Sequence, residues 1–160
     1  MSGQQPTGND SLAGLEVLVG EWTMAAKPPG GEPWPGEGRV SFEWLEGGRF
    51  LIQRWTVDLP EAPNGVALIG VGDTPVPISE TGDSQGGYRQ HYFDSRGVHR
   101  VYEMSLEGRT WKLWRDGPGF VPQRFTGEIS EDGKTITGRW EIAEDGENFK
   151  TDFDLTYTKV

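Results

Sequence analysis

The sequence predicts an all-β protein, a single antiparallel up-and-down barrel of about ten strands. From Glu21 onward, apolar and polar residues alternate in short runs, as they do in strands that bury one face. Glycine, Asp-Gly and proline residues separate these runs and are typical of turns. The apolar residues of successive hairpins can be aligned on one side of the sheet. Because a closed barrel leaves no exposed strand edge, we expect the sheet to close on itself.

The first residues are expected to precede the barrel. Residues 1–10 are polar and predict a disordered tail, and residues 11–160 form the barrel domain. Asp10 or Ser11 is positioned to cap a short helix that ends at Leu18. Along this segment leucine recurs every third residue, at Leu12, Leu15 and Leu18. The helix is therefore expected to plug one end of the barrel with its apolar side.

Ten strands are predicted after this helix. They are 21–26, 39–46, 49–57, 66–72, 87–94, 98–106, 109–115, 122–130, 134–143 and 148–159. Because neighbouring strands run in opposite directions, alternate connections share one end of the barrel. These are 27–38, 58–65, 94–97, 116–121 and 144–147. The short helix and the connection 72–86, which is rich in proline and glycine, lie at the other end.

The Asp-Gly turns at 132–133 and 145–146 predict the register of the last three strands. Two-residue loops place Gly138 opposite Phe153 on the inner face and Arg139 opposite Asp152 on the outer face. The inner face then contains Phe125, Trp140, Phe153 and Leu155. The Gly47-Gly48 turn similarly joins Val40, Phe42 and Trp44 to Leu51, Gln53 and Trp55.

The stretch YRQHYFDSRGVHRVYEM, residues 88–104, holds both histidines of the chain. If Gly97 forms a G1 bulge with positive φ, Asp94 pairs with Val98 and the two faces of this hairpin sort cleanly. The inner face then contains Tyr88, Gln90, Tyr92, Arg100, Tyr102 and Met104. His91 and His99 face outward, so we interpret them as surface residues.

Two inward arginines indicate an anionic ligand. A two-residue turn at Glu107-Gly108 places Trp111 beside Met104 and Arg115 directly opposite Arg100. Buried guanidinium groups are costly unless an anion pairs with them, and a carboxylate, phosphate or enolate would do so bidentately. The alternative is that both arginines sit at the rim, extending into water or pairing with loop acids such as Asp58, Asp94 or Asp116.

Aromatic and amide side chains complete the predicted site. Trp55, Tyr92 and Gln123 lie near the same end of the barrel, and Trp34, between two prolines, could fold over its mouth. Gln53 and Gln90 lie deeper, among Trp44, Tyr102 and Trp111. Contact with a ligand and hydrogen bonding to core tyrosines are alternative roles for these glutamines.

Composition excludes several classes of function. A net charge of −10 repels phosphate backbones, so nucleic acid is not expected as a partner. No run approaches the about 18 apolar residues of a membrane helix, and the polar start lacks the pattern of a secretory signal. We therefore expect a cytoplasmic protein. His91 and His99 lack a third ligand at a recognisable spacing, so no metal is expected.

The segment Leu18-Val-Gly-Glu-Trp22, in which the expected helix runs into a Gly-x-Trp, resembles the calycin superfamily. In those lipocalins and fatty-acid-binding proteins the tryptophan packs at the closed end of the barrel. Residues 12–160, with WLEGGRFLIQRW, YFDSRGVHRVYEM and FTGEISEDGKTITGRWE, resemble a family of uncharacterised bacterial calycin-like barrels. Nitrobindins, haem-binding relatives, carry an inward histidine late in the barrel. The late strands here hold no histidine, so neither haem nor another cofactor is expected.

Three functions are compatible with this sequence. The first is binding of a small aromatic or apolar, anionic organic ligand inside the barrel. The second is a cofactor-independent isomerase, cyclase or hydrolase that uses Tyr92 or Tyr102 as an acid and the two arginines to hold an oxyanion. The third is a protein-interaction module that uses the outward Phe93 and Trp114. A homodimer is compatible with all three.

Overall fold

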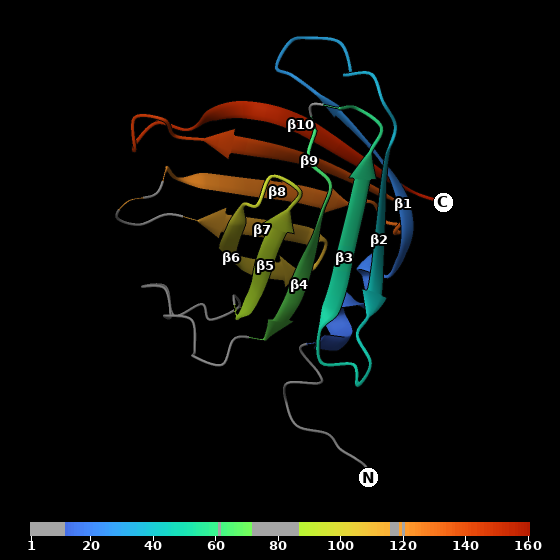
Figure 1. Ribbon diagram of the computed structural model, residues 1–160. Coiled ribbons are helices and arrows are strands. Elements are labelled where there is room, and N and C mark those ends of the chain that lie inside the picture. Colours follow the sequence, from blue (N-terminus) through green and yellow to red (C-terminus); the bar gives the residue numbers. More distant parts are fainter. Residues whose placement is uncertain (1–11, 61, 72–86, 116–118, 120) are drawn as a thin grey trace.

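The protein forms a closed barrel of ten antiparallel strands in the order of the sequence (Figure 1). The computed structural model describes residues 12–60, 62–71, 87–115, 119 and 121–160. The strands are β1 Gly20–Lys27, β2 Gly38–Trp44, β3 Leu51–Val57, β4 Gly65–Val71, β5 Tyr88–Asp94, β6 His99–Glu107, β7 Thr110–Arg115, β8 Gln123–Ile129, β9 Thr135–Ile142 and β10 Lys150–Lys159. Each pairs with its neighbours in the chain, and β1 pairs with β10 to close the sheet. The predicted all-β, up-and-down architecture is confirmed, and no strand end lies more than two residues from its predicted position.

The predicted N-terminal helix is a single 3₁₀ turn, η1 (Gly14–Leu18). A repeat of every third residue matches the three residues per turn of a 3₁₀ helix, so the leucine spacing fits this shorter element better than an α-helix. Leu15 and Leu18 are fully buried, and Leu12 is nearly so. The turn packs at one end of the barrel, at the bottom in Figure 1. The predicted tail, both candidate capping residues and connection 72–86 lie outside the described residues.

Three predicted hairpin registers are confirmed. Phe125 pairs with Trp140 between β8 and β9, and Phe42 pairs with Gln53 between β2 and β3. In the β5–β6 hairpin, Gly97 has a φ of 88°, and the backbone N–H of Asp94 donates to the carbonyl of Val98 at 3.0 Å. A positive φ is open to glycine without the steric cost of a side chain, which is why the bulge falls there. Both histidines lie on the outer face and are exposed.

Two predicted registers are wrong. Between β6 and β7 the turn is Gly108-Arg109, so Met104 pairs with Leu113 and not with Trp111. Between β9 and β10, Ile142 pairs with Lys150, one residue later than the Asp145-Gly146 turn predicts. The register shifts by one more residue between Thr151 and Phe153, which is the mark of a β-bulge. Asp154 therefore replaces Asp152 as the partner of Arg139, at 2.8 Å. The predicted inner face survives this shift, with Phe125 and Leu155 buried and Trp140 and Phe153 half-buried.

The two ends of the barrel are filled differently. At the end next to η1, apolar side chains from successive strands fill the interior: Trp22, Phe42, Leu51, Ile69, Tyr88 and Met104 are all buried. The Trp22 indole N–H donates to the Leu18 carbonyl at 2.9 Å, which joins the turn to the first strand. We call this the sealed end. The opposite end contains a cavity and is called the cavity end.

Candidate ligand-binding site

A cavity of about 510 Å³ occupies the barrel interior and reaches the connections at the cavity end. This volume lies within the range of small-molecule sites. Eight of the nine predicted site residues line it: Trp34, Gln53, Trp55, Gln90, Tyr92, Arg100, Tyr102 and Gln123. Arg115 does not. Residues from the connections add Pro35, Leu59, Pro63 and Arg96, and the inner face of the barrel adds Trp111, Phe125, Trp140 and Tyr157.

Aromatic rings form much of the cavity wall. Trp55 stacks on Tyr92 with ring centroids 5.3 Å apart, and Tyr102 meets Tyr92 edge-on at 6.2 Å. The Trp55 indole N–H donates to the Pro63 carbonyl at 3.1 Å, which fixes the ring toward the connection. Gly65 makes room for this ring, because a Cβ there would lie 2.3 Å from Trp55. The wall therefore offers flat apolar surfaces with few free polar groups.

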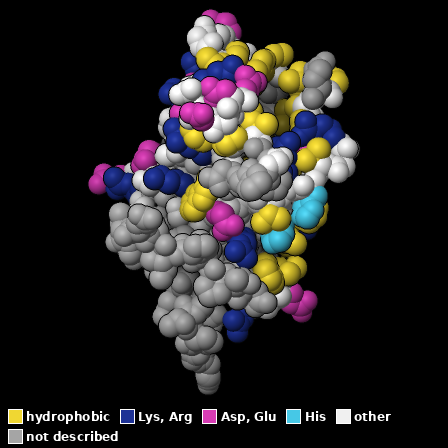
Figure 2. Space-filling model, turned by 90° about the vertical axis from the view of Figure 1, so that its left-hand side faces the viewer, with side chains coloured by type: hydrophobic (Ala, Val, Ile, Leu, Met, Phe, Trp, Pro, Cys, Tyr) yellow, Lys and Arg dark blue, Asp and Glu magenta, His cyan; other side chains and the backbone are white. Residues whose placement is uncertain are grey.

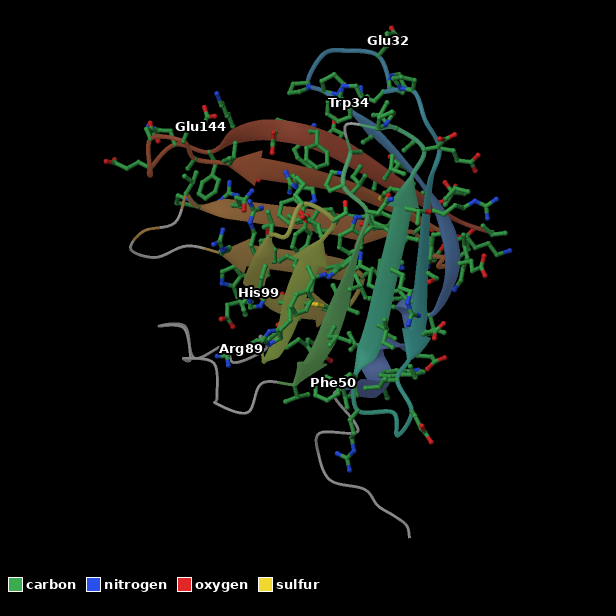
Figure 3. The ribbon with its side chains drawn as sticks, in the orientation of Figure 1. Glu32, Trp34, Phe50, Arg89, His99 and Glu144 are labelled. Carbon is green, nitrogen blue, oxygen red and sulfur yellow. The ribbon has the colours of Figure 1, made fainter. Side chains whose placement is uncertain are left out.

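Trp34 lies at the mouth of the cavity, as its position in the proline-rich connection predicts. Its backbone N–H donates to the Ala26 carbonyl at 2.9 Å, which holds the connection against β1. The centroids of the Trp34 and Phe153 rings lie 5.8 Å apart, and 44% of Trp34 is exposed. Figure 3 shows Trp34 in this connection, at the top of the barrel.

Arg100 brings a positive charge into the cavity. It pairs with Tyr92 across β5 and β6, and its guanidinium lies 6.0 Å from the centre of that ring. One guanidinium nitrogen donates to the Tyr102 hydroxyl at 3.5 Å, a long contact, and that hydroxyl donates to Gln123 Oε1 at 3.3 Å. Among the described residues, no carboxylate forms an ion pair with Arg100.

The predicted opposition of Arg100 and Arg115 is wrong. It followed from a turn placed at Glu107-Gly108, and the observed register moves β7 by two residues along β6. Arg115 pairs instead with Gln123 on β8, where it is half-buried and outside the cavity lining. Arg100 is thus the one predicted arginine that reaches the cavity.

A buried acid, Asp94, sits at the rim and was missed as an inward residue. Its carboxylate is fully shielded, and it accepts hydrogen bonds from Arg96 Nη2 at 2.6 Å and from the Tyr92 hydroxyl at 2.6 Å. The backbone N–H of Arg96 adds a bond at 2.8 Å. The Arg96 and Tyr92 hydrogen bonds hold the pKa of Asp94 well below its usual range, although burial opposes them. The Asp-x-x-Gly turn was the available signal, because aspartate at the first position of such turns bonds the following backbone.

Tyr92 is poorly suited to the role of an acid. Its hydroxyl proton is donated to Asp94, and burial together with the Asp94 carboxylate raises its pKa. A general acid works best with a pKa near the operating pH. The enzymatic alternative that uses Tyr92 as an acid is therefore not favoured.

Gln53 and Gln90 meet in the interior. Gln90 Nε2 donates to Gln53 Oε1 at 2.9 Å. Gln90 is only 4% exposed and Gln53 only 7% exposed. They come from β3 and β5 and reach one another across β4, where Ala67 is small. The alternative in which these glutamines bond core tyrosines is replaced by a bond between the two amides.

The outer face of β5 and β6 carries an aromatic patch next to the histidines. Phe93 and Val101 are each 38% exposed, and the Phe93 and His99 rings stack with centroids 4.7 Å apart. Figure 2 shows the two histidines beside hydrophobic side chains on this surface. Trp114, the other aromatic residue considered for an interaction surface, is half-buried. In the part of the chain that the structure describes, no three acidic or histidine side chains gather into a metal-binding group.

Comparison with known proteins gives a structural neighbour. No protein-family model matches the sequence, and no curated protein matches it. The crystal structure of Rv2717c from M. tuberculosis matches with a TM-score of 0.59 and 15% sequence identity, covering 94% of this chain and 97% of that chain. At this identity the likeness shows a shared fold.

Within the described ranges, no helix is long and apolar enough to cross a membrane.

Proposed function

We propose that this chain is a calycin-like barrel that binds a small aromatic or apolar organic anion in its cavity. Arg100 carries the proposal, because its guanidinium faces the cavity without a carboxylate partner among the described residues. A charge held in a partly buried site costs free energy unless an anion pairs with it. A ligand carboxylate could accept two hydrogen bonds from the planar guanidinium at once.

The shape of the site supports the same class of ligand. The stacked rings of Trp55 and Tyr92 would pack against a flat ring system, and a cavity of about 510 Å³ holds a molecule of two or three rings. The comparison with lipocalins rests on Gly20-x-Trp22, since Trp22 is buried at the sealed end beside Leu18. Proteins of that superfamily keep their ligand sites inside the barrel, which fits a cavity in this position.

A matched pair of probes tests the anion site. Calorimetric titration would compare 2-naphthoate with its neutral amide, 2-naphthamide, on the native protein and on Arg100→Met. We expect the native protein to prefer the acid, and the variant to lose about tenfold to a hundredfold in affinity for the acid only, because one charge-assisted contact is removed. Arg54→Met is the control, since Arg54 is exposed on the outer face and pairs with Glu43.

Other results would point elsewhere. Equal losses for acid and amide would give Arg100 a structural role, and an unchanged preference for the acid would place the anion site at another cation. Binding of neither probe would contradict an aromatic ligand. Urea unfolding of each variant shows whether the barrel itself is intact.

A further inference from the structure

The Gln53–Gln90 pair has unused hydrogen-bonding groups. The single bond between the amides occupies one N–H and one carbonyl oxygen. The Gln53 amino group and the Gln90 carbonyl have no bond to another described residue. Exchanging O and N in both amides reverses the bond and again leaves one amino group and one carbonyl. The pair therefore presents a donor and an acceptor side by side in either orientation.

These groups are open to the cavity. Both glutamines line it, although each residue is more than nine-tenths buried. Among the described residues, the one side-chain polar atom that is both sealed and without a partner is Trp111 Nε1. The free amide groups are therefore not sealed in the core but face the cavity space. Buried polar groups of this kind are normally satisfied, so a water or a ligand group is expected to meet them.

Trp111 packs at the same depth as the amide pair, but its indole N–H is sealed off from the cavity. Its ring lines the cavity and packs 6.0 Å from Phe42, which is the cross-strand neighbour of Gln53. The cavity thus has two polar levels, with the amide pair at depth and Arg100 nearer the mouth. Gln90 lies two residues from Tyr92, the partner of Arg100, which corresponds to about 7 Å along the strand.

We infer that the deep end of the cavity is a donor–acceptor subsite that takes a lactam edge, an N–H and a C=O on adjacent ring atoms. Such an edge would accept from one amide and donate to the other. This inference rests on the proposed function and narrows its ligand to a planar heteroaromatic lactam with an acidic group at its opposite end. A bicyclic ring spans the distance between the two levels.

The lactam subsite can be tested separately from the anion site. The probe is 2-quinolone-6-carboxylate, compared with 2-naphthoate and with the N-methyl derivative of the quinolone acid, which lacks the donor. We expect the native protein to bind the lactam acid about tenfold tighter than either comparison compound. In Gln53→Met with Gln90→Met, this preference should vanish, so that the lactam acid and 2-naphthoate bind with similar affinity. Replacing both partners avoids leaving one buried amide unpaired.

The outcomes separate the two proposals. If Arg100-dependent binding of 2-naphthoate holds but the lactam gives no advantage, the subsite is overturned and the anion site stands. If no carboxylate binds, neutral 2-quinolone still tests the subsite, because its binding should depend on the two glutamines alone. A preference for the lactam that survives the double variant would also overturn the inference.

Discussion

The two ends of this barrel are built from the same strands, yet they differ in what their inner residues do. At the sealed end, Leu51, Ile69 and Met104 are fully buried, and the leucines of η1 pack against that layer. At the cavity end the inner positions of the same sheet carry Tyr92, Arg100 and other half-buried polar groups.

The difference shows how one sheet can separate stability from binding. Apolar side chains that meet at the sealed end gain from burial and need no partners. The polar side chains of the cavity end are each held by a specific contact, such as that of Tyr92 with Asp94. Substitutions at the sealed end should therefore affect unfolding, and those at the cavity end should mainly affect the site.

The largest contrast is expected between two tryptophans. Trp22→Ala at the sealed end removes a fully buried ring and its hydrogen bond to Leu18, and should lower the free energy of unfolding by about 3–5 kcal/mol. Trp34→Ala at the cavity end removes a ring that is 44% exposed and should cost less than about 1 kcal/mol. Urea unfolding followed by circular dichroism measures both. Equal costs would show that the ends do not differ in this way.

Two glycines give the next contrast, which depends on space and not on φ. Gly65→Ala would place a Cβ 2.3 Å from the Trp55 ring and should destabilise the fold by about 1–3 kcal/mol while displacing that ring. Gly14→Ala places a Cβ 3.7 Å from the Tyr88 hydroxyl, an ordinary contact, and should change stability by less than about 0.5 kcal/mol. The free energy of unfolding measures the change in stability, and the fluorescence of Trp55 reports the displacement of its ring. An unshifted Trp55 spectrum in Gly65→Ala would contradict the packing argument.

The sequence predicted faces better than registers, and the reason is the period of a strand. Sliding a strand by two residues leaves every side chain on its own face, so alternation cannot detect such an error. The β5–β6 register was correct because Gly97 identifies its turn locally. The β6–β7 register was wrong by two residues, and the opposition of Arg115 to Arg100 was lost with it.

The same reasoning explains which site residues could be found. Alternation along the strands is enough to predict that Gln53, Gln90 and Tyr102 point inward, and all three line the cavity. The bond between Gln53 and Gln90 could not be predicted, since it joins two strands that are not paired with each other. Arg96 was missed because it belongs to a turn, where no alternation assigns a face. Asp94 ends β5 on the same face as Tyr92, but it was considered only as a loop acid that could pair with an arginine.

The smallest contrast expected here is between two acidic residues at the cavity end, the first of which is Asp94. Its folded pKa is lowered, chiefly by the Arg96 hydrogen bond, so the ionised carboxylate stabilises the fold above the unfolded pKa of about 3.9. That contribution is lost as pH falls through the folded pKa. Asp94→Asn should therefore cost about 1 kcal/mol at pH 7, a modest value because the Arg96 side chain is 55% exposed. The cost should begin to shrink below about pH 4, where the unfolded carboxyl takes up a proton while the native carboxylate stays ionised, and should vanish only as pH falls through the folded pKa.

Asp152 provides the control, because it lines the same cavity end and its pKa is shifted the other way. Burial and the nearby Glu144 raise the pKa of Asp152, so its ionised form opposes folding, and this penalty grows as pH rises through the unfolded and folded pKa values. Asp152→Asn should consequently leave stability at pH 7 unchanged or slightly increased. Urea unfolding of the native protein and of both variants between pH 3 and pH 7 compares them. If the Asp94→Asn cost were the same at both extremes, it would come from lost shape or neutral hydrogen bonding, and the rim would not depend on a charged Asp94.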